Sequence, residues 1–368
     1  MLRVVKWFTV VLFVVFGLGV NAQVINNPGK PSSPKAGRIA KLTEVFRITD
    51  DGGKFYFKRP YRIKAAPDGS IFIADDGQFL KFDKNGKFIA NIQKKGEGPG
   101  EFSYLLDFKV IGDRIFVVTQ QPPKVLEFDL SGKLIKETRR NDGSGMSRVL
   151  DINKSNYYFV FGDIDLEKIK SGEAQSHQKL MVSTFDGKKK ELNLDFPIRM
   201  LSEVVRTKNT MSVRIRTLDR FCVAFENENS IYVSHTEKYM IKHVDMVNGK
   251  ILHTFSRKYE PVAYFPSEDE KKNDLKSSVK WFSDVQQIAI FKGNVWVITS
   301  TVDKKKGALV DVFSKDGKYI DNFYLPLSQV KRPDFFTDNP FYAWGDYFLV
   351  IDIDEDDNIS IVKYKVEI

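Results

Sequence analysis

The chain has 368 residues, of which 42% are hydrophobic and 29% are charged, so it can bury a large core. Its only cysteine, Cys222, excludes an intramolecular disulfide, and the apolar run FCVAF around it predicts a buried, inert thiol. The net charge of +9 would suit an anionic partner, but the basic residues are spread along the chain. This spread favours an ordinary basic surface and argues against a nucleic-acid-binding protein.

Residues 1–22 have the pattern of a secretory signal peptide. Two basic residues, Arg3 and Lys6, precede an apolar run that ends at Val20, and the residues up to Ala22 fit a cleavage site. The run is shorter than the roughly 20 residues of a membrane-spanning helix, and an uncleaved anchor is the alternative. We therefore expect an exported protein, located in the periplasm, at the cell surface or secreted.

Two segments precede the main body of the chain. Residues 23–39 are rich in Pro, Gly, Ser and Asn, which predicts a flexible leader. Residues 42–48 (LTEVFRI) then alternate between apolar and polar side chains, which predicts a strand. This strand has no neighbour in the sequence with which it could form a hairpin.

From Arg59 to Phe102 the sequence contains four short alternating segments. Turn residues separate them, such as PDG at 67–69 and NG at 85–86. Alternation with a period of two predicts strands, and these turn sequences predict hairpins. Four successive antiparallel strands are the unit of a β-propeller blade.

The unit recurs six times along the chain. Each second strand carries an aromatic residue: Phe72, Phe116, Phe159, Tyr232, Trp296 and Phe348. Five units have a glycine turn between the third and fourth strands: Gly86, Gly132, Gly187, Gly249 and Gly317. The sixth unit lacks a fourth strand, so residues 42–48 are predicted to complete it and close the ring. The sequence thus predicts an all-β, single six-bladed β-propeller over residues 40–368, with an open array or two β-sandwiches as the alternative.

The long connections are predicted to gather on one face of this propeller. Turns after the first and third strands stay short, and successive turns of a meander alternate between the two faces. In residues 197–218, the segments SEVVRT and SVRIRT predict an extra hairpin on the long-loop face, which carries Arg214 and Arg216. Short helices are expected within 163–175 and from Ser267.

The most specific motif is G-x-GPGEF within QKKGEGPGEF, at Gln93–Phe102. It resembles exported bacterial six-bladed β-propellers of the NHL-repeat type. The resemblance extends to the signal sequence and to the whole mature chain. It implies a propeller scaffold, usually with no assigned chemistry. The full motif occurs only once here, so a regular ligand-binding repeat is not expected.

Three patterns imitate functional motifs. The glycines of GEGPG have the wrong spacing for a dinucleotide-binding loop, and Pro99 removes an amide donor. DIDEDDN at 352–358 lacks the glycine and glutamate of a calcium-binding loop. His177 and His235 fall in segments expected to be loops on the long-loop face, where a two-histidine metal site is conceivable but isolated surface histidines are favoured. We expect no metal and no cofactor.

The candidate binding residues lie at the predicted channel mouth and on the extra hairpin. In a propeller the innermost strand of each blade starts at the long-loop face. The residues near these starts are Tyr61, Tyr104, Arg148, Arg220, Trp281 and Tyr342, and the hairpin adds Arg214 and Arg216. Aromatic and arginine side chains together suit a glycan, peptide or carboxylate ligand. Packing between blades is the plainer interpretation of any single one.

The leading hypothesis is a non-enzymatic, monomeric, exported binding module. Its long-loop face would take an envelope protein, a peptide or a glycan, and membrane contact is expected only through an uncleaved signal. The alternative is a metal-dependent hydrolase or lyase with its site in the central channel. For this the innermost strands offer Asp107, Asp151, Asn153 and Asp284.

Overall fold

The computed structural model of the chain describes residues 23–50, 52–141, 148–163, 169–206, 210–266, 271, 279–327, 330, 332–334 and 342–368. The expected signal peptide, residues 1–22, lies outside these residues, and so does Ser267, where the second short helix is expected to begin. Within them, no helix has the length and apolar character that crossing a membrane would require.

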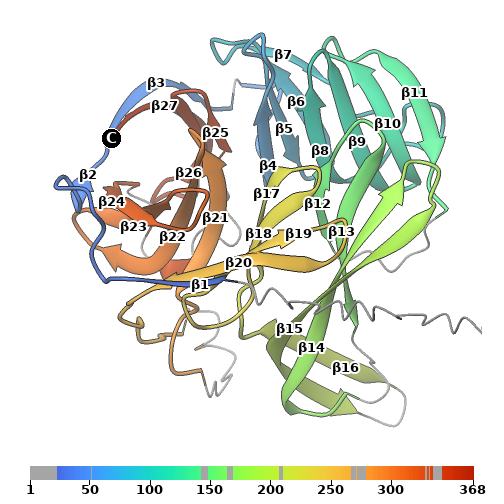
Figure 1. The fold of residues 1–368 in the computed structure, drawn as a ribbon. Coiled ribbons are helices and arrows are strands. Elements are labelled where there is room, and N and C mark those ends of the chain that lie inside the picture. Colours follow the sequence, from blue (N-terminus) through green and yellow to red (C-terminus); the bar gives the residue numbers. More distant parts are fainter. Residues whose placement is uncertain are drawn as a thin grey trace, which may run out of the picture.

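Six antiparallel sheets form the ring that the repeats predict (Figure 1). Blade 1 contains β4 (Arg62–Ala65), β5 (Ile71–Asp75), β6 (Gln78–Phe82) and β7 (Phe88–Asn91). Blade 2 contains β8 (Tyr104–Ile111), β9 (Arg114–Gln121), β10 (Pro123–Asp129) and β11 (Leu134–Arg139). Blade 3 contains β12 (Arg148–Ile152), β13 (Asn156–Asp163), β14 (Gly172–Thr184), β15 (Lys189–Arg206) and β16 (Met211–Thr217).

The second half of the ring repeats this plan. Blade 4 contains β17 (Cys222–Asn227), β18 (Ser230–Ser234), β19 (Ile241–Asp245) and β20 (Lys250–Arg257). Blade 5 contains β21 (Val285–Phe291), β22 (Asn294–Asp303), β23 (Gly307–Phe313) and β24 (Tyr319–Leu325). Blade 6 contains β25 (Tyr342–Trp344), β26 (Tyr347–Ile353), β27 (Ile359–Glu367) and, from the other end of the chain, β3 (Lys41–Ile48).

The core lies between the blades. Six apolar clusters are buried, and each joins two neighbouring sheets, including the last blade to the first. At the interface of blades 1 and 2, for example, the rings of Phe79 and Phe108 meet with centroids 4.8 Å apart. All six predicted second-strand aromatics are buried, and such a side chain contributes about 1.5–3 kcal/mol when it leaves water. The strand alternation therefore forms the blades, and the second-strand aromatics pack between blades 1 and 2, 2 and 3, 4 and 5, and 5 and 6.

The ring is closed by the N-terminal strand, as predicted. β3 pairs antiparallel with β27, and Ile48, which faces Ile361 in the register, is 3% exposed. An ion pair from Arg47 to Asp352 of β26 ties the strand further into the blade. The prediction of a closed six-bladed β-propeller is confirmed.

Residues 23–39 are not the flexible leader that their composition predicts. β1 (Gln23–Asn27) adds a parallel strand to the outer edge of β20, and β2 (Arg38–Ile39) adds one to β24. The Asn27 side chain donates to the carbonyls of Ser256 and Gly317, each at 2.9 Å, and so bridges blades 4 and 5. The unpaired backbone groups of two edge strands order a segment whose own sequence has little strand propensity.

Blade 3 departs from the four-stranded plan as the sequence predicted. β15 continues past the blade and pairs with β16, and this hairpin projects from the ring (Figure 1). The expected helix within 163–175 is corrected in part: Gly172–Gln175 begin β14 because they pair with Arg199–Ser202 of β15, and 164–168 lie outside the described residues.

The GPGEF motif is a turn built around a buried lysine. Lys124 is 0% exposed, and its Nζ donates to the carbonyls of Glu97 at 3.0 Å and Gly98 at 2.7 Å. Its charge is balanced by Glu137 at 2.9 Å, which also accepts the Gly100 N–H at 2.7 Å. These contacts explain why the loop is a connection between blades and not a phosphate site: its polar groups are already bonded within the protein.

We predict that Lys124→Met lowers the free energy of unfolding by about 3–5 kcal/mol, because it leaves Glu137 and two carbonyls without their buried partner. Urea denaturation measures the change. The matched control is Lys136→Met on β11, where the lysine is exposed; a loss within about 0.5 kcal/mol is expected there. Equal effects of the two substitutions would contradict the role given to Lys124.

Candidate ligand-binding site

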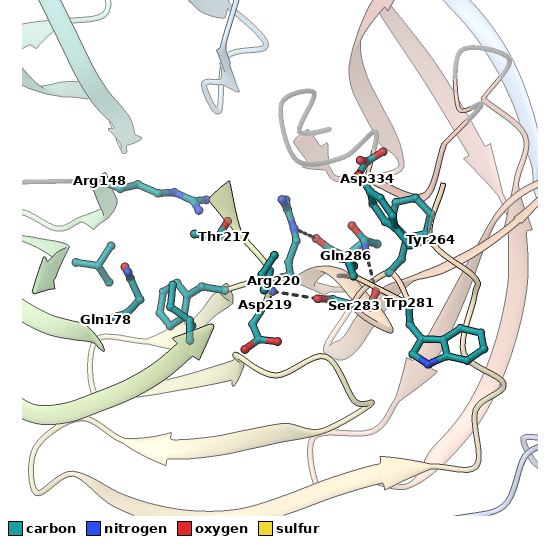
Figure 2. A pocket seen from close by; sticks show the side chains of 16 residues that line it. Arg148, Gln178, Thr217, Asp219, Arg220, Tyr264, Trp281, Ser283, Gln286 and Asp334 are labelled. Atoms are coloured by element: carbon teal, nitrogen blue, oxygen red, sulfur yellow. Dashed lines mark hydrogen bonds between the residues drawn. The ribbon is translucent and has the colours of Figure 1, made fainter. Parts of the chain in front are cut away.

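A cavity of about 410 Å³ opens on the long-loop face beside the central channel. It lies where blade 3, blade 4 and the connection before β21 meet (Figure 2). Three of the predicted residues line it, namely Arg148, Arg220 and Trp281. The positions near the start of neighbouring inner strands therefore converge here, as the blade geometry predicts.

Arg148 is the first residue of β12, and its side chain extends toward Thr217 and Arg220 (Figure 2). Within the part of the chain that the structure describes, it makes no hydrogen bond and no ion pair. Protein surrounds the guanidinium although water reaches it, and this desolvation lowers its pKa. The positive charges of Arg62 and Arg220 lower the pKa further. The channel mouth is thus a cationic site without an internal anion for Arg148.

Arg220 is held in place by the start of blade 5. Its Nε–H donates to the carbonyl of Gln286 at 2.8 Å, and its backbone N–H donates to Ser283 Oγ at 3.1 Å. The Gln286 side chain is 2% exposed and donates to the Ser283 carbonyl, but its Oε1 accepts no hydrogen bond from the described residues.

The carboxylates that line the cavity have cation partners of their own. Asp219 is 6% exposed and pairs with Arg199 at 2.7 Å. Asp334 pairs with Arg332 at 2.9 Å. Neither arginine lines the cavity, so these acids do not offset the charge of Arg148 at close range.

The other predicted channel residues take different positions. Tyr61 donates its hydroxyl to the Leu105 carbonyl at 2.7 Å, which fixes blade 1 to blade 2. Tyr342 packs into the core between blades 6 and 1, where burial raises its pKa. Tyr104 is 46% exposed at the start of β8, and it does not line the cavity. For Tyr61 and Tyr342 the packing interpretation is therefore the better one.

The two hairpin arginines lie on β16. Arg214 is exposed and is 3.8 Å from Glu203 across the hairpin. Arg216 pairs with Leu201 in the register, and its side chain is not among those described. The hairpin and the cavity belong to the same blade, because β15 also supplies Ile198 to the cavity wall.

The four side chains considered as ligands of a channel metal each bond to a different partner within the protein. Asp107 contacts Arg62 at 3.2 Å, and Asp151 contacts Lys109 at 2.7 Å. Asp284 accepts the N–H of Tyr239 at 2.8 Å. Asn153 accepts the backbone N–H groups of its own turn. Among the described residues no group of three metal-ligating side chains is found.

The prediction that both histidines lie in loops is wrong for His177 and confirmed for His235, which lies in the connection between β18 and β19. His177 lies within β14, where its Nδ1 is 2.8 Å from Asp195, and His235 follows β18 with its Nδ1 3.0 Å from the Pro197 carbonyl. Burial lowers the pKa of His235, and its neutral Nε2 accepts a hydrogen bond from Lys242 at 2.8 Å. The strand β14 is longer than the sequence suggested because β15 continues beside it.

Sequence reasoning missed several cavity residues. Ser283 and Gln286 lie at the start of an inner strand that was correctly identified, but the alternation did not show which of Gln286 and Gln287 faces the cavity. Tyr264 comes from a long connection without a repeat pattern to fix its position. A bridge between Ala263 and Trp281 brings that connection back to the channel mouth.

Residues 49–273 match a protein family, DUF5128, described as a 6-bladed β-propeller. The chain belongs to this family. The description names the propeller architecture and gives neither a repeat type nor an activity. A search of curated proteins finds no match.

Solved structures with a similar fold include proteins from Bacteroides species. A DUF4221 family member from Bacteroides vulgatus has a TM-score of 0.52 at 10% identity, covering 90% of this chain and 99% of that one. A protein from Bacteroides fragilis with the printed name "Putative exported protein" has a TM-score of 0.48 at 15% identity, covering 94% and 100%. Virginiamycin B lyase from Staphylococcus aureus has a TM-score of 0.44 at 10% identity, covering 89% and 99%. The first likeness shows the fold alone, and the other two carry no argument.

Asp284 yields a prediction about pH. Burial, which is the largest cause, raises its pKa to about 6, above the value of the unfolded chain. The folded state therefore binds more protons between about pH 4 and pH 6, and this group makes stability fall as pH rises through that window. Asp284→Asn keeps an oxygen for the Tyr239 N–H and removes the titration. The variant should gain stability relative to wild type between pH 4.5 and pH 7 in urea denaturation, whereas a difference that does not change with pH would contradict the assignment.

Proposed function

We propose that this protein is an exported, non-enzymatic binding module that takes an anionic ligand in the long-loop cavity. Arg148 carries the proposal. Its guanidinium is exposed in the cavity, contacts no carboxylate among the described residues and lies close to the positive charges of Arg62 and Arg220, so an incoming carboxylate, sulfate or phosphate gains a charge-assisted contact. Export is supported by the signal-peptide pattern of residues 1–22.

The cavity suits one end of a larger molecule. Its volume of about 410 Å³ is in the range of ligand pockets, and it is open to solvent on the long-loop side. Arg148 supplies a fork of donors for an oxyanion. Trp281 is 41% exposed at the far side from Arg148 and offers an aromatic surface (Figure 2). An acidic glycan and a peptide with a free carboxylate both have this combination of groups.

The hairpin of β15 and β16 extends the proposed surface. It projects from the blade that supplies Arg148, and the exposed Arg214 adds positive charge beside the cavity. A polymer held in the cavity by one group would pass along this hairpin. The metal-dependent hydrolase or lyase has less support, because Asp107, Asp151 and Asp284 each have a partner within the protein.

The proposal is tested by isothermal titration of residues 23–368 with matched acidic and neutral ligands. The pairs are an oligouronate against a neutral oligosaccharide of equal length, and a peptide acid against its C-terminal amide. At least one acid should bind about tenfold or more tightly than its neutral partner, because a charge-assisted bidentate contact is worth more than 1.4 kcal/mol. Arg148→Gln should remove that preference.

The control variant is Arg214→Gln, which removes the same charge outside the cavity. If Arg148→Gln abolishes the preference for the acid and Arg214→Gln changes it little, the cavity is the binding site. If Arg214→Gln abolishes the preference and Arg148→Gln does not, the site lies on the hairpin. If neither acid binds more tightly than its neutral partner, or if Arg148→Gln leaves the preference intact, the proposal is wrong.

A further inference from the structure

A second cavity, of about 470 Å³, lies at the seam where the ring closes. Its walls come from three places: β3, the Trp344–Tyr347 turn of blade 6, and the two short turns of blade 1 at 67–69 and 84–85. These short turns belong to the face opposite the long loops. The seam cavity is therefore separate from the site that contains Arg148.

Lys363 of β27 lines this cavity and is the unusual residue in it. The residue is only 7% exposed, and its Nζ makes no hydrogen bond or ion pair with any residue in the described ranges. Three aromatic rings surround the ammonium group, with Nζ 4.3 Å from the Tyr347 centroid, 5.1 Å from Trp344 and 5.4 Å from Phe46. Cation–π contacts stabilise the charge, but they leave its three donor hydrogens without an acceptor.

The burial of Lys363 is costly to the fold. Desolvation lowers its pKa below the ordinary 10.5. A leucine or methionine would fill the same core position between blades 6 and 1 without that cost. The neighbouring Asp68 makes no ion pair with Lys363 in the described structure, and its two oxygens accept hydrogen bonds from Ser70 within their own turn.

We propose that the seam cavity is a second binding site, and that it takes a small carboxylate attached to a flat ring. The carboxylate would accept hydrogen bonds from the Lys363 ammonium group. The ring would pack against Trp344 and Tyr347, whose own rings are stacked with centroids 6.0 Å apart. Lys84 and Asn85 at the rim give the cavity a polar entrance.

A ligand in this position touches both sides of the seam. Phe46 belongs to the closing strand and Lys84 to the first blade, so the site exists only when the ring is closed. Such a ligand binds the folded state alone and raises the melting temperature by mass action. The site thus couples ligand binding to the closure of the propeller.

Benzoate is the probe, and benzyl alcohol is its neutral match with the same ring. Isothermal titration of wild-type residues 23–368 should give saturable binding of benzoate that is about tenfold tighter than that of benzyl alcohol. Lys363→Met should reduce the affinity for benzoate about tenfold. Arg148→Gln, which changes the other cavity, should leave benzoate binding unchanged.

The outcomes separate the two sites. Loss of benzoate binding on Arg148→Gln, with none on Lys363→Met, would assign the anion to the long-loop cavity and overturn this proposal. Absence of saturable benzoate binding up to about 10 mM, or equal binding of acid and alcohol, would also overturn it. The comparison of benzoate with benzyl alcohol uses wild-type protein and so does not depend on any variant. If Lys363→Met does not fold, Lys363→Gln replaces it in the benzoate titration.

Discussion

The pairing of β3 with β27 is the constraint on which the molecule depends. A β-sheet with unpaired edges invites association with other chains, and a ring of blades avoids this only if its last blade is complete. Here the fourth strand of blade 6 comes from the other end of the chain, so blades 1 and 6 share a buried core through Ile48 and Ile361. The same topology brings the leader past blades 4 and 5, where β1 and β2 cover the outer edges.

The two faces of the closed ring, the long-loop face and the short-turn face, carry different side chains. The long connections meet at one face, where Arg148 and Arg220 from adjacent blades lie beside a channel lined by further charged residues. The other face has short turns, and its cavity at the seam is aromatic with one buried lysine, Lys363. Among the described residues neither Arg148 nor Lys363 has a carboxylate in contact, and this is the feature on which both proposed anion sites rest. Repeat folds commonly reserve one face for binding, and this one offers a candidate on each.

The sequence was sufficient to predict the blades because the pattern of each blade lies within one continuous stretch of the chain. Alternation and one aromatic in each second strand recur six times, five units add a glycine turn, and the missing fourth strand identified the role of residues 42–48. The leader was mispredicted because β1 and β2 are ordered by distant edge strands and not by their own residues. The candidate site was predicted only in part: strand starts gave Arg148 and Arg220, but Tyr264 and Gln286 depend on loop paths and strand facing. Lys363 was missed because its position in β27 follows the ordinary strand alternation, and the rings around it come from β3 and from the Trp344–Tyr347 turn, which are far from it in sequence.

Hydrogen exchange of the backbone amides of β3 tests the closed ring most directly. The account predicts that the β3 amides facing β27 exchange as slowly as those of β26, since opening them requires the whole ring to unfold. The amides on the outer edge of β3 should exchange faster, which provides an internal reference. If all amides of 41–48 exchange at the rate of an unstructured peptide while β26 and β27 stay protected, the ring is not closed by this strand, and the seam cavity does not exist.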